Sequence, residues 1–209
     1  MGGSDDDGSG RTRAPGAVVF DTIRADLQHA RRVNGCNSGG LGSWLRILLR
    51  PGSHAVLAYR FAAWSARRHT PVVRHLAIAV STVLRYVVEI VTGVEISPSA
   101  EIGPGLVVHT VNGVYVTTTR IGRNCILQHG VVISDGVRRI GDDVYFGAGA
   151  KVIGRAAIGN NVRVVANSLV MTDVADDLTV VGVPARIRWR NRSVAASIVA
   201  SLLTMAPPG

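Results

Sequence analysis

The hydrophobic pattern changes character near residue 93. Before that point, apolar residues recur at the spacing of amphipathic helices and predict four of them, over residues 18–32, 41–50, 53–68 and 71–91. Pro51-Gly52 is a stop signal between the second and third. We therefore expect a helical domain over 17–92, preceded by a disordered Gly/Ser/Asp-rich tail over 1–16.

After residue 93 the apolar positions follow a six-residue period. Counted from Ile96, each inward position is aliphatic or Phe if one extra residue is allowed after Val114, one after Ile133 and two after Val170. The series is Ile96, Ile102, Val108, Val114, Ile121, Leu127, Ile133, Ile140, Phe146, Val152, Ile158, Val164, Val170 and Leu178. Glycine often follows the inward position, and Gly-Asn or Gly-Asp turn chemistry recurs.

This period predicts a parallel β-helix over residues 93–188. Six residues make one flat face, and three faces complete a triangular coil of about 18 residues whose axis is filled by one aliphatic side chain per face. A β-sandwich would show longer strands and more aromatic residues. The fold class is therefore α+β, with a C-terminal tail or helix over 189–209 that contains an apolar stretch at 194–205.

Composition limits the partners. The net charge of +9 raises the question of nucleic acid or an anionic membrane. However, all basic residues except Lys151 are arginines scattered along the chain, and aromatic residues make up only 5%, too few for base stacking. We expect no nucleic-acid partner.

The most membrane-like stretch covers residues 76–91. It is short and carries Arg85 and Glu89, so a buried or interface helix is the favoured interpretation, and peripheral membrane association is the alternative. Cys36 and Cys125 have neither metal nor redox spacing, and the N-terminal segment lacks the apolar core of a signal peptide. These features favour a cytoplasmic location.

Three stretches carry a resemblance to a known family. Residues 48–64 (LLRPGSHAVLAYRFAAW), 92–109 (TGVEISPSAEIGPGLVVH) and 182–187 (GVPARI), together with the hexapeptide repeats, resemble bacterial serine O-acetyltransferases, which are left-handed β-helix acyltransferases. The resemblance spans about residues 18–190. It implies a homotrimer or a dimer of trimers, with acetyl-CoA as co-substrate and no metal.

His109 is the candidate catalytic base. It follows an inward position, so its side chain should point outward. A histidine near its ordinary pKa can take the proton of a hydroxyl that attacks a thioester, and the resemblance gives His109 this role. Glu95 matches a carboxylate, normally Asp, that orients the base. A surface position without function is the alternative for each.

The resemblance also implies that acetyl-CoA lies along the groove between neighbouring β-helices, where small corner residues allow close backbone approach. The matching positions are Gly147, Ala148, Gly149, Lys151 and Ala166. Arg186 and Arg190, near the last coil, are candidates for contacts with the phosphates of CoA. A structural corner or an ordinary surface charge is the alternative at each position.

The acceptor side departs from the family. Asn34-Gly35 replaces an Asp-Pro pair, Val108 replaces an Asp, and the loop with an Arg-His pair is shortened to residues 134–139, leaving Arg138 and Arg139 as candidates. Three lost charged contacts, about 1.5–3 kcal/mol each, favour a sugar or other small-molecule hydroxyl over serine. True serine acetylation in cysteine biosynthesis is the alternative.

The sequence leaves rival functions open. His129 is a second histidine near the base and a candidate substrate contact. Two histidines in the repeat region fall short of the three expected for a zinc carbonic anhydrase on this architecture. A non-catalytic scaffold and a membrane-peripheral enzyme acting on a lipid-linked glycan remain as rival hypotheses. The C-terminal Ala-Pro-Pro-Gly lacks the Ile with which some family members dock the next enzyme of cysteine synthesis, so we expect no such partner.

Overall fold

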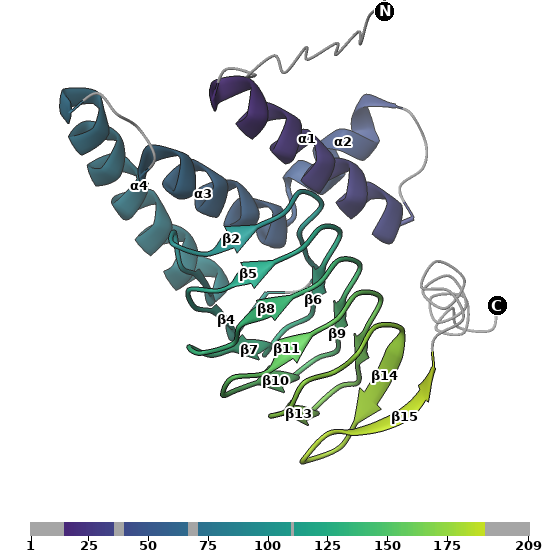
Figure 1. Cartoon of the computed structure of the whole chain (residues 1–209). Coiled ribbons are helices and arrows are strands. Elements are labelled where there is room, and N and C mark those ends of the chain that lie inside the picture. The colour runs from purple at the N-terminus through teal and green to yellow at the C-terminus, as the bar shows by residue number, and fades with distance from the viewer. Residues whose placement is uncertain (1–14, 36–39, 67–70, 110, 191–209) are drawn as a thin grey trace, which may run out of the picture.

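The computed structural model describes residues 15–35, 40–66, 71–109 and 111–190 (Figure 1). Four helices precede the strands, as the apolar spacing predicts: α1 (Pro15–Val33), α2 (Leu41–Leu48), α3 (Pro51–Ala66) and α4 (Pro71–Thr92). Helix α1 begins inside the range assigned to the tail, because proline is well suited to the first helical position. The rest of the predicted tail lies outside the described residues.

The strands form three stacked faces of a parallel β-helix. The first face contains β1 (Val94–Ile96), β4 (Val114–Val116), β7 (Val132–Ile133), β10 (Lys151–Val152) and β13 (Leu169–Val170). The second contains β2 (Glu101–Ile102), β5 (Arg120–Ile121), β8 (Arg139–Ile140) and β11 (Ala157–Ile158). The third contains β3 (Val107–Val108), β6 (Ile126–Leu127), β9 (Tyr145–Phe146), β12 (Arg163–Val164), β14 (Leu178–Val181) and β15 (Arg186–Arg190).

One apolar side chain per strand fills the axis of the coil, with Leu127, Phe146 and Ile158 fully buried. The predicted inward positions are right except at two points. Val116, rather than Val114, pairs with Ile96 and Ile133, so the extra residues of that coil lie in the corner at 109–113. Both valines are buried, and the apolar period alone does not tell them apart.

The second error concerns the last coil. Val174 bridges to Ile158 and Val180 pairs with Val164, so these two residues, and not Leu178, continue the inward series. Strand β15 then pairs antiparallel with β14 and reaches Arg190, two residues beyond the expected end of the β-helix. Every residue of β15 is exposed. The remaining C-terminal segment, 191–209, lies outside the described residues.

A buried ion pair joins the helices to the first coil. The Arg60 Nε and Nη2 atoms donate to Asp26 at 2.9 and 3.1 Å, and the two side chains are only 8% and 4% exposed. Asp26 also accepts hydrogen bonds from the backbone N–H groups of Gly105 and Leu106. Arg60 donates to the carbonyl oxygens of residues 102 and 103. These hydrogen bonds therefore join the two side chains to each other and to one corner of the β-helix.

Helix α3 lies directly on the backbone of the first coil. A methyl group built at Gly52 would lie 2.0 Å from the carbonyl oxygen of Val108, so only glycine fits there. Further along the helix, the Tyr59 hydroxyl donates to the carbonyl of Ala100 at 2.7 Å. The start of α3 is thus held against the strand that leads to His109.

Helix α4 leaves a long apolar face uncovered. It packs against α3 and β1, but Leu76, Val80, Val83, Val87 and Ile90 are between 50% and 82% exposed. A groove of about 520 Å³ lies between α3 and α4, and Val87 of this face is among its lining residues. The expectation of a buried helix is therefore wrong, and an interface helix remains. By length and composition, residues His75–Thr92 could also cross a membrane, and only 11% of that window is buried.

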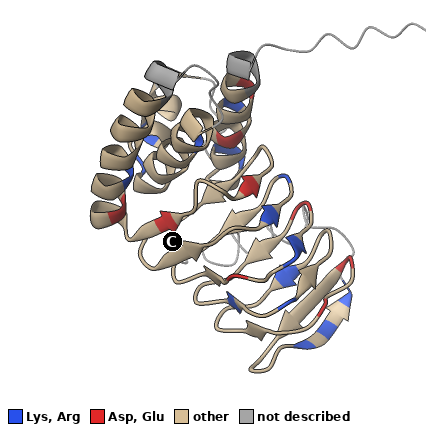
Figure 2. Cartoon of the chain, turned by 60° about the vertical axis from the view of Figure 1, so that its left-hand side comes forward, with Lys and Arg blue, Asp and Glu red and all other residues tan. Residues whose placement is uncertain are grey.

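Charged side chains are spread over the molecule. Figure 2 shows basic residues along successive strands of the β-helix, interleaved with acidic ones. Several are paired between coils, as in the exposed bonds from Arg123 to Asp142 and from Arg120 to Glu101. Both pairs connect neighbouring coils.

The buried pair should stabilise the fold far more than an exposed pair of the same length. Replacement of Arg60 by Met leaves the Asp26 carboxylate buried without its cation, so we expect Arg60→Met to lower the free energy of unfolding by about 3–5 kcal/mol. The control is Arg120→Met, which removes an exposed 2.9 Å bond to Glu101 and should cost less than about 1 kcal/mol. Urea unfolding measures both, and similar losses would contradict the assignment.

Candidate functional site

His109 lies at the corner where the third face turns into the first. It follows β3, its backbone N–H donates to the carbonyl of Leu127 at 3.0 Å, and its side chain is half-buried. Because β3 and β6 are in register at Val108 and Leu127, Gln128 occupies the matching place in the next coil. Its side chain makes a hydrogen bond with the His109 ring.

The surroundings of His109 favour the neutral imidazole. Burial lowers its pKa from the usual value, the positive charge of Arg50 lowers it further, and the hydrogen bond with Gln128 acts in the opposite direction. A neutral ring near pH 7 can accept a proton. Its Nδ1 atom is buried and has no hydrogen-bond partner within the described ranges.

Glu95 lies in the middle of β1, on the first face, where it pairs with Tyr115 of β4. Its side chain is half-buried, and among the described residues it makes no recorded hydrogen bond with His109. Its charge is also not among the causes that shift the pKa of the ring. The polar side chain that contacts the ring is Gln128, and the orienting role of Glu95 stays a prediction.

The residues predicted to hold acetyl-CoA gather along the same edge as His109. The ladder places His109, Gln128 and Gly147 one above the other, and adjacent strands are about 4.8 Å apart, so Gly147 lies about 10 Å from His109. A methyl group at Gly147 would lie 2.5 Å from the backbone nitrogen of Ala166, so the two corners stack closely.

Not all of the remaining residues predicted to contact CoA lie on this edge. Ala148 accepts a backbone hydrogen bond from Asn167, and Gly149 has a left-handed φ of 70° that glycine tolerates best. Lys151 is exposed at the start of β10, just past this corner. Arg186 and Arg190 lie on the exposed strand β15 at the end of the third face. Their contacts with CoA stay predictions.

The candidate acceptor residues fall into two groups. Asn34, at the end of α1, donates from Nδ2 to the carbonyl of Ala30 at 2.6 Å, and His129 is exposed next to Gln128 on the His109 edge. Arg138 and Arg139 lie instead where the first face turns into the second. Arg138 is bound to Asp173 there. Within one chain, both arginines are therefore on a different corner from His109.

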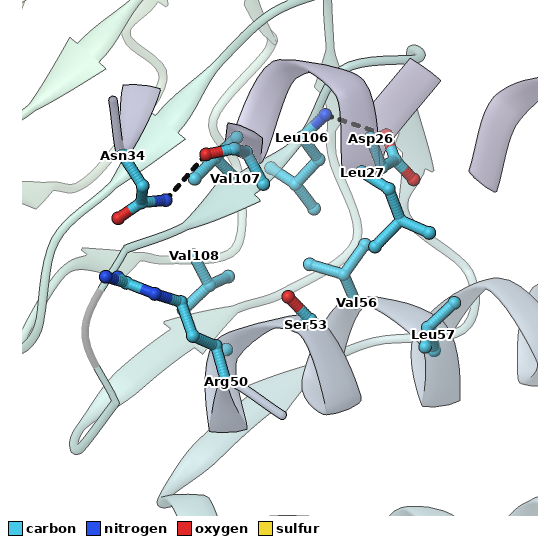
Figure 3. Close-up of a pocket in the computed structure, with 12 residues that line it drawn as sticks. Asp26, Leu27, Asn34, Arg50, Ser53, Val56, Leu57, Leu106, Val107 and Val108 are labelled. Carbon is cyan, nitrogen blue, oxygen red and sulfur yellow. Dashed lines mark hydrogen bonds between the residues drawn. The ribbon is translucent and has the colours of Figure 1, made fainter. Parts of the chain in front are cut away.

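A pocket near the His109 corner contains Arg50, a residue that the sequence analysis did not single out. It lies between α1, the start of α3 and β3, and Asn34, Arg50, Ser53 and Val108 help to line it (Figure 3). Arg50 immediately precedes the Pro51-Gly52 stop signal, so in the sequence it reads as the end of a helix. Only the packing of α3 against β3 brings it next to Val108, the residue before His109.

A helical domain followed by a left-handed β-helix, with a histidine at a corner lined by small residues, defines a hexapeptide-repeat acyltransferase. No protein-family model matches the chain. Serine acetyltransferases from Helicobacter pylori strain J99 and Mycobacterium tuberculosis are 38% and 34% identical to it over 158 and 206 residues. These matches cover 71% and 89% of this chain, and 88% and 86% of the relatives. The chain belongs to the serine acetyltransferase family, which confirms the resemblance.

Solved structures agree with this placement. A serine acetyltransferase from Neisseria gonorrhoeae in complex with serine has a TM-score of 0.67 at 30% identity, covering 83% of this chain and 70% of that one. A serine acetyltransferase in complex with CoA has a TM-score of 0.69 at 26% identity, covering 82% and 70%. The predicted combination of helices and β-helix is therefore confirmed.

The influence of Arg50 on His109 can be measured directly. Because the positive charge of Arg50 disfavours the imidazolium, Arg50→Gln should raise the pKa of His109 toward its ordinary value. An NMR titration of protein labelled at histidine Cε1 reports this midpoint. Arg46→Gln, on the exposed side of α2, is the matched control and should leave it unchanged. An unchanged midpoint in Arg50→Gln would place the guanidinium away from the ring.

Proposed function

We propose that this protein transfers the acetyl group of acetyl-CoA to the hydroxyl of L-serine, with His109 as the general base. As a family member it is an acetyl-CoA-dependent O-acetyltransferase, and L-serine is the finer part of the proposal. The observation that carries it is the position of His109: a half-buried, neutral imidazole on the same edge as the small corner residues Gly147, Ala148 and Ala166.

The reaction requires one proton relay. His109 accepts the proton of the acceptor hydroxyl as its oxygen attacks the carbonyl carbon of the thioester. The new C–O bond forms, the C–S bond breaks, and the imidazolium returns the proton to the CoA thiolate. Backbone N–H groups at the corners are suited to stabilise the oxyanion. The products are the O-acetyl ester and free CoA.

L-Serine has more support than the sugar or other small-molecule hydroxyl that the altered acceptor residues favour. Relatives named serine acetyltransferase match most of the chain, and one structural neighbour was solved with serine. The sequence departures at positions 34, 108 and 134–139 remove three charged contacts to an amino acid. Arg50, which the fold places next to Val108, supplies a positive charge on the acceptor side of the base.

Removal of the base should abolish most of the activity. With acetyl-CoA and L-serine we expect His109→Ala to lower kcat by about 10²- to 10⁴-fold, the usual share of general-base catalysis. Release of the CoA thiol measures the rate, and circular dichroism checks that the variant is folded. Full activity in His109→Ala would overturn the role of the base, whereas turnover of sugars and not of L-serine would overturn the acceptor.

The pH profile of the wild type gives a second readout of the same group. Because the pKa of His109 is lowered, kcat/KM should be at its plateau near pH 7 and fall as the pH drops through that lowered pKa, below about 6.5. The acid limb should be absent from the residual activity of His109→Ala. Persistence of the limb in that variant would assign it to another group.

We also propose that the uncovered face of α4 packs against further copies of this chain, in line with the expected homotrimer. Its exposed apolar residues recur every three or four positions, the spacing of helix–helix contacts. Exposed apolar residues gathered on one face are typical of an interaction site. We further propose that the protein is located in the cytoplasm, as the sequence leads us to expect.

Charge on the α4 face should dissociate the assembly. We expect the double variant Val83→Glu/Ile90→Glu to show a lower mass by light scattering than the wild type, because carboxylates would have to be buried in the contact. The control is Phe20→Glu, which changes a residue on α1 that is 75% exposed. Unchanged mass in the double variant, or a monomeric wild type that binds phosphatidylcholine vesicles, would contradict the contact between copies.

A further inference from the structure

The pocket between α1, the start of α3 and β3 is lined by Arg50 and by Val108, the residue that precedes the base. We infer that Arg50 binds the carboxylate of the acceptor and so selects an amino acid over a sugar or a simple alcohol. This inference rests on the proposed function and assigns the residue that decides the class of acceptor. It concerns substrate binding, so Arg50 takes no proton and forms no covalent bond.

Arg50 is placed and equipped for this role. Its side chain is half-buried in the pocket wall, and Figure 3 shows it extending beside Val108 on the side where Asn34 lies. Within the part of the chain that the structure describes, its guanidinium has no recorded hydrogen bond or ion pair. A guanidinium has five N–H donors in a planar arrangement, and two of them can form parallel hydrogen bonds with one carboxylate.

The other charged candidates already have partners of opposite charge. Asp26, also in the pocket wall, is held by Arg60 and two backbone N–H groups, so its charge is compensated. Arg138, a candidate from the sequence, is bound to Asp173 on another corner. Among the described residues, Arg50 is the one charged side chain that acts on the pKa of His109. A carboxylate near the base would therefore meet Arg50.

The chemistry of a hydroxy amino acid fits this arrangement. Its carboxylate and its hydroxyl are separated by only a few bonds, so a carboxylate held by Arg50 brings the hydroxyl within reach of His109. Binding also neutralises the charge that disfavours the imidazolium, and this raises the proton affinity of the ring in the complex. A sugar supplies no charge to pair with the half-buried guanidinium, and an uncompensated charge in such a site is costly.

The test compares L-serine with L-serinamide, which keeps the hydroxyl and the amino group but lacks the carboxylate. With saturating acetyl-CoA, we expect Arg50→Gln to raise KM for L-serine by about 10- to 100-fold, the size of a charge-assisted contact, with a smaller change in kcat. KM for acetyl-CoA should not change. For L-serinamide at pH 8, where His109 is neutral with or without Arg50, wild type and Arg50→Gln should have similar kcat/KM values.

Two further variants separate binding from folding. Arg50→Lys keeps the charge but not the planar fork, so we expect it to recover part of the affinity for L-serine. Arg46→Gln removes an exposed arginine from the preceding helix and should behave as the wild type with both acceptors. Thermal unfolding of all three variants identifies any loss of structure, which would raise both KM values together.

The outcomes distinguish this inference from the proposed function. If the wild type acetylates L-serine and Arg50→Gln does so with an unchanged KM, the proposed function stands and the role of Arg50 is overturned. The same holds if Arg50→Gln weakens L-serine and L-serinamide equally. If the wild type acetylates a sugar and not L-serine, both proposals are overturned. A selective loss of L-serine binding with partial rescue by Arg50→Lys supports the inference.

Discussion

The ion pair between Asp26 and Arg60 is the contact on which the geometry of the candidate site depends. It is buried, and its remaining hydrogen bonds all end on the corner at residues 102–106 of the first coil. These bonds fix α1 and α3 on the β-helix, and α3 then lies so close to β3 that residue 52 has no room for a side chain. The pocket that contains Arg50 and the corner that contains His109 are therefore parts of one rigid junction.

The β-helix contributes mainly through its backbone. Each coil repeats the same corner, and the register places His109, Gln128 and Gly147 in one ladder. Small residues keep the backbone of this edge accessible, which suits a long co-substrate held by peptide groups more than by charged side chains. The helices contribute side chains that the repeat itself does not supply. Donor binding is thus expected from the repeat, and acceptor choice from the junction between helices and β-helix.

The sequence was sufficient for the fold because a six-residue apolar period has few structural solutions. Its errors arose where two apolar residues compete for one inward position, as Val114 and Val116 do, or where turns change the spacing, as before Val174. His109 was found because a histidine is unusual at a glycine-rich corner. Arg50 was not, because its importance comes from packing between segments far apart in sequence. Arg138 lies on another corner of the same chain, which a linear motif does not show.

Strand β15 has a consequence for the solubility of such a fold. A parallel coil exposes unpaired N–H and C=O groups at each end and could in principle grow by stacking molecules end to end. At the first end, α3 and α4 pack against β1. At the other, β15 reverses direction and alternates Arg186, Arg188 and Arg190 with Ile187 and Trp189. Three like charges on the last strand that the structure describes repel a second molecule, which favours a discrete particle over a fibre.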